Sequence, residues 1–251
     1  MNKELKQIID KSSNMVFFGG AGVSTESGIP DFRSENGLYN AQRKYGHSPE
    51  EMLSHSFFVR NNEEFFDYYK NNLIYPEIKP NKAHLALAKL EEMGKLKAVI
   101  TQNIDGLHQL AGSKNVYELH GSVLRNYCID CGKFYDLEYI MNTNNCLDKK
   151  GIKSLVPVCN KCGGIVKPDV VLYEEALDQQ VIEGAVKAIE EADTLIVGGT
   201  SLVVYPAAGL ITYFRGSNLI LINRDQTTFD KRADLVIREP IGEVLGDILS
   251  I

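Results

Sequence analysis

The chain has 251 residues and a formal net charge of −6; 44% of its residues are hydrophobic and 24% are charged. These ordinary globular values exclude a disordered or repeat protein, and the length allows one domain with a small insert. The negative charge argues against direct nucleic-acid binding, because such proteins carry a basic face. No apolar run approaches the roughly 20 residues that span a bilayer, and the N-terminus lacks the apolar core of a secretion signal. We therefore expect a cytoplasmic protein with no membrane partner.

An amphipathic helix is predicted over residues 1–14, and five short apolar runs follow it along the chain. Helical stretches separate these runs, which is typical of an α/β fold whose sheet carries helices on both faces. The predicted strands are 15–18, 98–100, 195–197, 219–222 and 235–237.

Two segments of different composition interrupt this pattern. Residues 32–79 carry clustered aromatic side chains and predict a helical insert, in which the aromatics pack a core rather than bind a ligand. Residues 125–168 are rich in Cys, Lys, Asn and Gly and predict a small module. The remaining ranges, 1–31, 80–124 and 169–251, are predicted to form the large domain.

The residues that follow the predicted strands indicate a nucleotide cleft. Open α/β sheets bind ligands outside the carboxyl ends of their strands. Four of the five predicted strands run into glycine, hydroxyl or amide residues, namely GGAGVS from 19, TQNID from 101, GGTS from 198 and NRD from 223. One edge of the sheet therefore collects small polar residues from distant segments.

The first of these loops contains Gly20, Ala21, Gly22 and Ser24, whose backbone N–H groups suit a pyrophosphate at a helix start. Two of the glycines match the start of GxGxxG, but Thr25 takes the third position, and no clear second strand ends in an acid about twenty residues later. This disfavours a standard dehydrogenase. A tight turn without a ligand is the alternative for this motif.

A second glycine turn spans 199–201 and supplies two hydroxyls, which suit a phosphate or ribose oxygen. The alternative is an ordinary N-cap by Thr200 or Ser201 for a following helix. Asn223 ends its predicted strand with a side chain that can both donate to and accept from ribose hydroxyls.

The TQNID segment, 101–105, places two amides and the Asp105 carboxylate at the end of a buried strand, where they need partners. Such a site can hold a carboxamide and a ribose, which favours nicotinamide dinucleotide over ATP. The sequence also has no GxxxxGK[ST] phosphate loop, which weakens an ATPase function.

His120 is the candidate catalytic residue. It follows a short apolar run and precedes Gly121. An imidazole can accept a proton near neutral pH if it reaches the cleft, although an isolated histidine in this setting is more often structural. The histidines without a comparable setting are His47, His55, His84 and His108.

Two CxxC pairs predict a structural zinc site. Cys128 with Cys131, and Cys159 with Cys162, flank a spacer somewhat longer than the usual 15 to about 20 residues. Four thiolates close a tetrahedral shell without an open position for water, so the zinc is structural. Two disulfides are the alternative, which a reducing compartment disfavours. Cys146 lies in the spacer and is predicted to be an exposed thiol.

Together these motifs resemble the sirtuins, the NAD-dependent protein lysine deacylases. The resemblance covers nearly the whole chain, in family order. It implies a Rossmann-like doubly wound parallel sheet, with a smaller domain made of the zinc module and the helical insert. NAD and acyl-lysine would enter between them. The motifs are GAGVS at 20–24, GIPDFR at 28–33, TQNID at 101–105, HG at 120–121, the paired CxxC motifs, and GTSLVVYPA at 199–207.

The resemblance also implies roles for individual residues. Asn103, Ile104 and Asp105 would line the nicotinamide pocket, and Ile241 would flank the adenine. The substrate backbone would be clamped by Val171, Tyr173 and Val204. The other expected NAD contacts are Gly20, Ala21, Thr25, Phe32, Arg33, Gln102, His120, Gly199, Thr200, Ser201 and Asn223.

The implied reaction removes an acyl group, above all acetyl, from protein lysine and releases nicotinamide and O-acyl-ADP-ribose. The acyl oxygen first displaces nicotinamide, and His120 then acts as general base on a ribose hydroxyl. A mono-ADP-ribosyltransferase that uses the same NAD site is the main alternative. A non-catalytic zinc ribbon for nucleic acid is a third possibility, which the net charge opposes.

The chain departs from the family pattern at three places. Gly19 stands where the family usually has threonine. Glu174 replaces a glycine beside the expected substrate clamp. Phe66–Tyr69 lacks the arginine that sirtuins selective for succinyl or malonyl groups carry, so we expect acetyl or longer apolar acyl chains.

Overall fold

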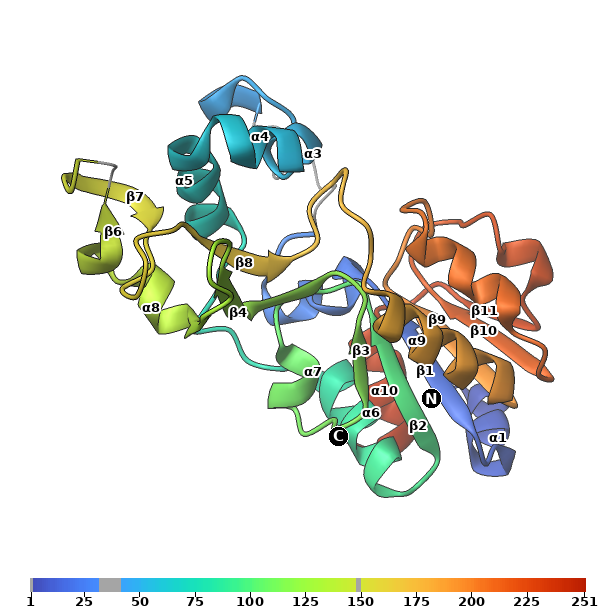
Figure 1. Cartoon of the computed structure of the whole chain (residues 1–251). Helices are drawn as coiled ribbons and strands as arrows, with labels where there is room; N and C mark the ends of the chain where they lie inside the picture. The colour runs from blue at the N-terminus through green and yellow to red at the C-terminus, as the bar shows by residue number, and fades with distance from the viewer. Residues whose placement is uncertain (1, 32–41, 148–149) are drawn as a thin grey trace.

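The computed structural model describes residues 2–31, 42–147 and 150–251. A six-stranded sheet covered by helices forms one part of the molecule, and shorter helices and small sheets form a second part beside it (Figure 1). The chain enters the second part twice, first through α3 to α5 and later through β4 to β8. No helix within the described ranges is long and apolar enough to cross a membrane.

The large sheet has the order β11-β10-β9-β1-β2-β3, and every neighbouring pair is parallel. All five predicted strands are confirmed. The sixth, β3, is a three-residue edge strand of intermediate burial that lacks the apolar run used to find the others. The strands are β1 Met15–Gly19, β2 Leu96–Thr101, β3 Val116–Glu118, β9 Thr194–Gly198, β10 Asn218–Ile222 and β11 Leu235–Ile237.

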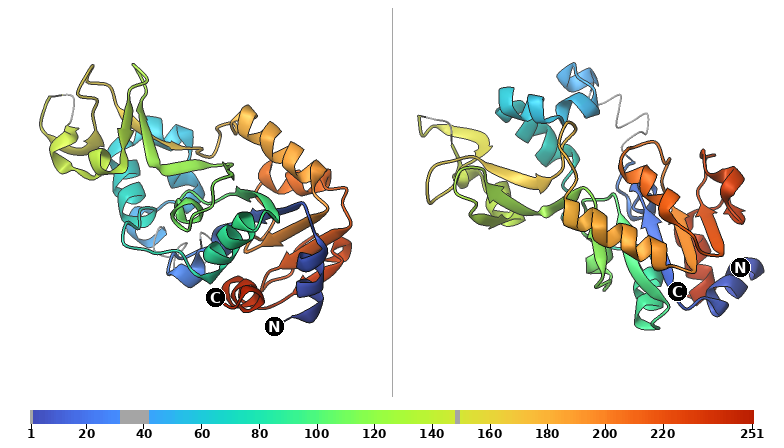
Figure 2. Two further views of the ribbon diagram at one scale, coloured as in Figure 1. Left: turned by 90° about the horizontal axis from the view of Figure 1, so that it is seen from below. Right: turned by 45° about the vertical axis from the view of Figure 1, so that its right-hand side comes forward.

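Helices cover both faces of this sheet, as the predicted α/β fold requires (Figure 2). Successive side chains of a strand point to opposite faces. In β1, Met15 and Phe17 therefore pack with α1, α6 and α10, whereas Val16 and Phe18 pack with α9 and η4. These elements are α1 Lys3–Lys11, α6 Lys82–Glu92, α9 Gln179–Glu191, η4 Ala207–Tyr213 and α10 Ile241–Leu249.

The second part has one hydrophobic core built from two distant segments. Phe58, Phe65 and Phe66 of the helices pack in one cluster with Val123 and Val166 of the small antiparallel sheet β5-β4-β8. The clustered aromatics thus form a core, as predicted. The elements are α3 Pro49–Met52, α4 His55–Arg60, α5 Asn62–Asn72, β4 Gly121–Cys128, β5 Phe134–Asp136, α8 Leu137–Met141, η3 Thr143–Asn145, β6 Cys146–Leu147, β7 Lys153–Pro157 and β8 Val166–Val170.

Cys146 corrects one prediction, because its side chain is fully buried rather than exposed. Its Sγ lies 3.3 Å from the Lys70 Nζ of α5 and 3.8 Å from the carbonyl oxygen of Ile140. The polar neighbours of Cys146 in sequence suggested a surface loop, but pairing of β6 with β7 turns the thiol inward. Cys146 therefore belongs to the packing of the second part.

The two parts meet where β3 leads into β4 and where β8 leads toward α9. The predicted division between 124 and 125 falls inside β4, which begins at Gly121. The short α7, Leu107–Leu110, follows β2, and η5, Asp230–Arg232, precedes β11. The segment that carries His120 is thus the junction itself.

Candidate active site and metal centre

The carboxyl ends of four neighbouring strands lie level at one edge of the large sheet. Gly19 pairs with Thr101 on one side and with Gly198 on the other, and Gly198 pairs with Ile222. From β1 the chain moves outward to β2 and β3, and later from β9 outward to β11. The strand order therefore reverses between β1 and β9, which is where open α/β sheets bind ligands.

The loops after β1 and β9 contact one another at this reversal. The Gly22 N–H donates to the Gly199 carbonyl oxygen at 2.8 Å. A Cβ on Gly22 would lie 2.8 Å from the Gly199 Cα, and one on Gly20 would lie 2.9 Å from the Thr200 Cβ. Glycine is required here because the two backbones approach too closely for side chains.

The predicted amide cradle in the first loop is wrong in one respect. The N–H groups of Gly20, Gly22 and Ser24 donate to carbonyl oxygens of Gly198, Gly199 and Ala21, so these amides are already occupied. The loop forms two 3₁₀ turns, η1 Ala21–Val23 and η2 Thr25–Ser27, instead of opening a long helix. A 3₁₀ turn bonds its own amides locally, so these glycines serve close loop packing.

A hydrogen-bonded network joins the loops after β1 and β2. The Ser24 hydroxyl donates to Asp105 Oδ2 at 2.7 Å, and Asn103 Nδ2 donates to Ser24 Oγ at 3.1 Å. The Leu107 N–H donates to Asp105 Oδ1 at 2.9 Å. The Ile104 carbonyl accepts from the Val123 N–H, so this segment also contacts β4. The buried polar groups of TQNID thus have the partners that their burial requires.

Gln102 connects this network to the loop after β9. Its Nε2 donates to Thr200 Oγ1 at 3.0 Å, and the same oxygen accepts from the Leu202 N–H. The N-cap alternative for this turn is wrong, because the next helical element, η4, begins only at Ala207. Ser201 is exposed beside Thr200. The structure therefore brings the two predicted motifs together.

Three further predicted NAD residues that the structure describes lie around the same edge. Thr25 Oγ1 donates to the Gly22 carbonyl, and Asn223 Nδ2 donates to the Asp225 carbonyl at the end of β10. Ile241, the first residue of α10, is buried against Gly198, where a Cβ would lie 2.2 Å from the Ile241 Cδ1. Phe32 and Arg33 lie outside the described residues.

His120 stands at the junction with its tautomer fixed by a backbone carbonyl. Its Nδ1 lies 2.9 Å from the Gln102 carbonyl oxygen, which can only accept, so Nδ1 donates. Burial lowers the pKa of His120, and the bond to Gln102 opposes this in part. The ring is therefore neutral at pH 7, and its Nε2 can accept a proton.

Gly121 is required beside His120. Its φ is +77°, and a Cβ would lie 1.9 Å from the Asp169 carbonyl oxygen of β8. The Val171 N–H donates to the His120 carbonyl at 3.0 Å. The end of β8 therefore lies directly against the histidine.

The predicted substrate residues continue from this contact. The Tyr173 N–H donates to the Leu53 carbonyl at 3.0 Å, and its carbonyl accepts from the His55 N–H at 2.9 Å, so the segment pairs with the start of α4. Val204 lies half-buried in the loop after β9, and its carbonyl accepts from Ala208. Val171 and Tyr173 thus share one segment, which leads away from His120.

Glu174 keeps the left-handed backbone that a glycine would adopt, with φ +77°. Its Oε2 accepts from the Ser56 N–H in the first turn of α4 at 2.8 Å. This bond compensates for the conformational cost, because a carboxylate is favoured at a helix N-terminus.

His84 and His108 were missed by the sequence analysis. Their rings lie side by side with centroids 4.8 Å apart, both buried. Burial lowers the pKa of His84 to about 4 and that of His108 to about 3, while the Asp105 carboxylate partly opposes the shift of His84. His108 follows Asp105 in TQNIDGLH, which was the available signal. The pair therefore lies, uncharged, beneath the amide and carboxylate network.

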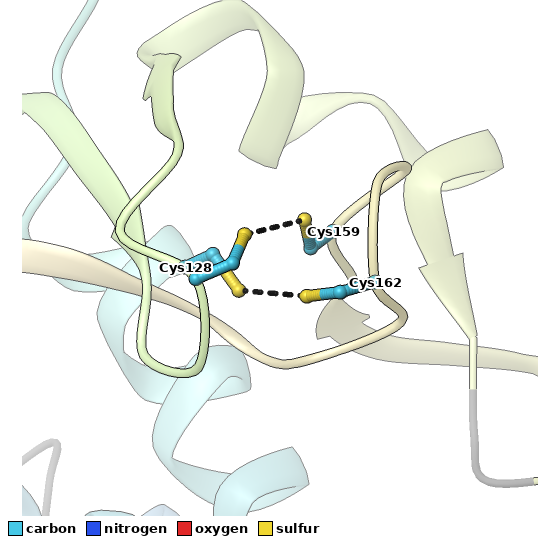
Figure 3. A group of neighbouring side chains, drawn as sticks. Cys128, Cys159 and Cys162 are labelled. Carbon is cyan, nitrogen blue, oxygen red and sulfur yellow. Dashed lines mark hydrogen bonds between the residues drawn. The ribbon is translucent and has the colours of Figure 1, made fainter.

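The four predicted cysteine ligands form one cluster (Figure 3). Their Sγ atoms all lie within 4.8 Å of one another; Cys128 and Cys162 are 3.4 Å apart, and Cys131 and Cys159 are 3.7 Å apart. Tetrahedral zinc with Zn–S bonds of about 2.3 Å sets its sulfurs about 3.8 Å apart, so the cluster fits zinc. All five cysteines are free thiols, which excludes the disulfide alternative here.

Comparison with known proteins identifies the family. The family model described as "Sir2 family" matches residues 20–206. The chain belongs to the Sir2 family. The "NAD-dependent protein deacetylase" of Clostridium perfringens is a relative with 67% identity over 98% of each chain. This placement confirms the resemblance to sirtuins.

Solved Sir2 structures confirm the fold class as well. A histidine-to-alanine variant of Sir2 with deacetylated p53 peptide and 3'-O-acetyl ADP-ribose has a TM-score of 0.87 and 40% identity, covering 99% of this chain and 97% of that chain. Sir2 with p53 peptide and NAD⁺ has a TM-score of 0.85 and 39% identity, covering 100% and 98%. The two-part architecture is therefore that of Sir2.

The structure shows the surroundings of two positions at which this Sir2 family member departs from the usual family pattern. At Gly19 a Cβ would lie 2.6 Å from the Phe17 ring, so the phenylalanine fills the space that a threonine side chain would need. Phe66 and Tyr69 lie on α5 with their side chains fully buried, and burial raises the pKa of Tyr69. Lys70 of the same helix has its Nζ 5.6 Å from the centroid of the Phe66 ring and donates to the Leu155 carbonyl, so the nearby cation already has partners.

Proposed function

We propose that the protein is an NAD-dependent protein lysine deacetylase that releases nicotinamide and O-acetyl-ADP-ribose. The observation that carries this function is the position of His120. A neutral imidazole, oriented by the Gln102 carbonyl, stands beside the network of Ser24, Asn103 and Asp105 at the reversal of strand order. Membership of the Sir2 family supports the same function.

Each loop at this edge has a proposed role toward the co-substrate NAD. Asn103, Ile104 and Asp105 line the nicotinamide pocket. The support is that they directly follow Gln102, whose carbonyl contacts His120, and that Asn103 and Asp105 bond to Ser24. Asn223 and Ile241 hold the adenosine end at the opposite side of the reversal, supported by their position after β10 and at the start of α10. The other proposed contacts are Gly20, Ala21, Thr25, Phe32, Arg33, Gln102, Gly199, Thr200 and Ser201.

His120 acts as the general base. Since Nδ1 donates to Gln102, the lone pair of Nε2 is available to take a proton from a ribose hydroxyl after nicotinamide has left. The Gln102 carbonyl then stabilises the cationic ring that forms, because it already accepts from Nδ1. This is the step that separates deacetylation from simple release of nicotinamide.

The protein substrate binds beside Val171, Tyr173 and Val204. The first two residues lead away from His120 along the segment after β8, which supports an extended peptide running past the base. The acyl group faces α5, where Phe66 and Tyr69 offer no positive charge. We therefore expect acetyl or longer apolar acyl groups over succinyl, because an acidic group would need a cation.

Zinc is structural in this proposal and would be held by Cys128, Cys131, Cys159 and Cys162. Bound there, it crosslinks the β4 turn to the loop before β8 and has no open position for water. The proposed large domain corresponds to the predicted 1–31, 80–124 and 169–251, and the proposed small domain to the predicted 32–79 and 125–168. Both boundaries beside the zinc module move to strand ends, so that β4 Gly121–Cys128 and β8 Val166–Val170 belong wholly to the small domain. A reducing, cytoplasmic compartment suits four free thiolates, and the acidic chain has no proposed nucleic-acid partner.

One assay tests the function against its alternative. Purified protein with NAD and an acetylated peptide should give free lysine peptide and O-acetyl-ADP-ribose in equal amounts by mass spectrometry. A mono-ADP-ribosyltransferase would instead give ADP-ribosylated protein without deacetylation. Loss of product in His120→Ala, with zinc still bound, would support the assignment of the base; undiminished turnover would refute it.

A further inference from the structure

Arg125 of β4 forms ion pairs with acidic residues of two different sheets. Its Nη1 donates to Glu118 Oε2 at 2.7 Å, and its Nε donates to Asp169 Oδ2 at 2.8 Å. Glu118 ends β3 at the edge of the large sheet, whereas Asp169 lies in β8 of the small sheet. One guanidinium therefore joins the two parts of the molecule through charge-assisted hydrogen bonds.

The residues that Arg125 holds lie on either side of His120. Glu118 precedes the histidine in the chain, and Asp169 lies against Gly121, whose Cβ position is 1.9 Å from the Asp169 carbonyl oxygen. One residue past the end of β8, the Val171 N–H donates to the His120 carbonyl oxygen. A shift between β3 and β8 would therefore move the histidine relative to Gln102.

The Glu118 carboxylate is the buried member of this bridge. The Glu118 side chain is only 9% exposed, so its carboxylate depends on a partner, whereas Arg125 and Asp169 are 38% and 40% exposed. Removing one partner of a buried pair strands the other charge, which weakens the local structure. The planar guanidinium also fixes direction, because its donors form a rigid fork that lysine cannot copy.

We propose that Arg125 is a positioning residue for the reaction: by bridging Glu118 and Asp169 across the junction, it fixes the segment that presents His120 to the cleft. The inference rests on the proposed function, in which His120 is the base. The side-chain hydrogen bonds of Arg125 go to Glu118 and Asp169, neither of which is a proposed NAD or peptide residue, so Arg125 acts through the histidine. Its loss should therefore affect the base step more than binding.

The first test separates positioning from general destabilisation. For Arg125→Gln we expect kcat for deacetylation to fall roughly ten- to hundredfold, as for a misplaced catalytic group. The KM for NAD, the zinc content and the exchange of labelled nicotinamide into NAD should change less than about threefold, because nicotinamide departs before His120 acts. Equal losses of exchange and deacetylation would overturn the proposal. Arg232→Gln, an exposed arginine stacked on Phe229, is the matched control and should match wild type.

A second variant covers the case in which Arg125→Gln folds poorly. The triple variant Arg125→Met, Glu118→Gln and Asp169→Asn leaves no stranded charge, so its melting temperature should recover toward that of the wild type. Under the proposal its kcat stays low, because the bridge is still missing. Recovery of kcat together with stability would show that Arg125 only neutralises its neighbours, and would refute positioning.

A third readout does not depend on turnover. The His120 Nδ1–H resonance, assigned by its loss in His120→Ala, should be protected from exchange in the wild type and in Arg232→Gln, and exchange-broadened in Arg125→Gln. A protected resonance in Arg125→Gln would contradict the proposal even if the wild type proved to have another activity. Absent deacetylation by the wild type would instead refute the proposed function alone.

Discussion

His120 Nδ1 lies 2.9 Å from the carbonyl oxygen of Gln102, the first residue after the buried strand β2. Because a carbonyl accepts only, this contact fixes which ring nitrogen carries the proton and leaves the other to act as base. Backbone geometry, rather than a carboxylate partner, thus orients the ring. The charge of the site therefore changes with pH when the His120 imidazole gains or loses a proton.

The pH dependence of deacetylation should report this imidazole. Burial lowers the pKa of His120 below its ordinary 6.5, so activity is present above that range and is lost as pH falls through the lowered value. We expect the acid limb of kcat against pH to have its midpoint below 6.5 and to vanish in His120→Ala with a loss of about a hundredfold or more. A midpoint above 7 would contradict the environment described.

Stability should fall in acid because of His84 and His108. The unfolded chain binds protons on both rings near pH 6.5, whereas the folded chain does so only near pH 4 and pH 3. The unfolded state thus holds more protons below about pH 6.5. The free energy of unfolding therefore falls by about 1.4 kcal/mol for each pH unit and each ring. Urea unfolding between about pH 7 and pH 4 measures this slope.

The double variant His84→Gln with His108→Gln should flatten that slope, because glutamine keeps polar atoms without titrating. His47→Gln is a suitable control, since His47 is far more exposed and pairs with Glu51 on the surface. An unchanged slope in the double variant would show that other groups govern the acid response.

Loss of one cysteine ligand should remove zinc and destabilise the second part of the molecule. Cys128→Ser and Cys162→Ser should each fall well below one zinc per chain and lose several degrees of melting temperature, because metal binding contributes directly to folding. Cys146→Ser is the matched control, since this buried thiol lies outside the cluster and should leave zinc content unchanged. Elemental analysis with thermal unfolding decides the result.

Two substitutions at Glu174 should differ in their effect on the stability of the fold. Glu174→Gly removes the bond to Ser56 but suits the left-handed backbone, whereas Glu174→Ala removes the bond and keeps the strain. The alanine variant should therefore be less stable than the glycine variant by about 1 kcal/mol. Chemical denaturation measures the difference, and equal stabilities would argue against strain at this position.

Much of the fold could be predicted because its signals are local. The buried strands have continuous apolar runs, and the CxxC pairs need only a turn to bring two sulfurs together. β3 was missed because three half-buried residues at an edge carry no such run. Cys146 was misjudged because its burial arises from β6 pairing with β7, which its polar neighbours conceal.

The site was predicted less completely for a similar reason. The motifs identified loops that the structure brings together at one edge of the sheet. The amides of Gly20 and Gly22, however, bond to Gly198 and Gly199, because the reversal of strand order brings β9 against β1. The His84 and His108 pair depends on α6 packing beside α7, which no single segment encodes. Contacts between distant segments decide such features.

The shared core of the second part limits how this protein can be dissected. Since the aromatics of α4 and α5 pack against β4 and β8, neither segment buries its apolar surface without the other. A zinc module expressed alone would expose that face and aggregate. Chimaeras that exchange acyl specificity between relatives would therefore need to transplant the helices and the zinc module as one unit.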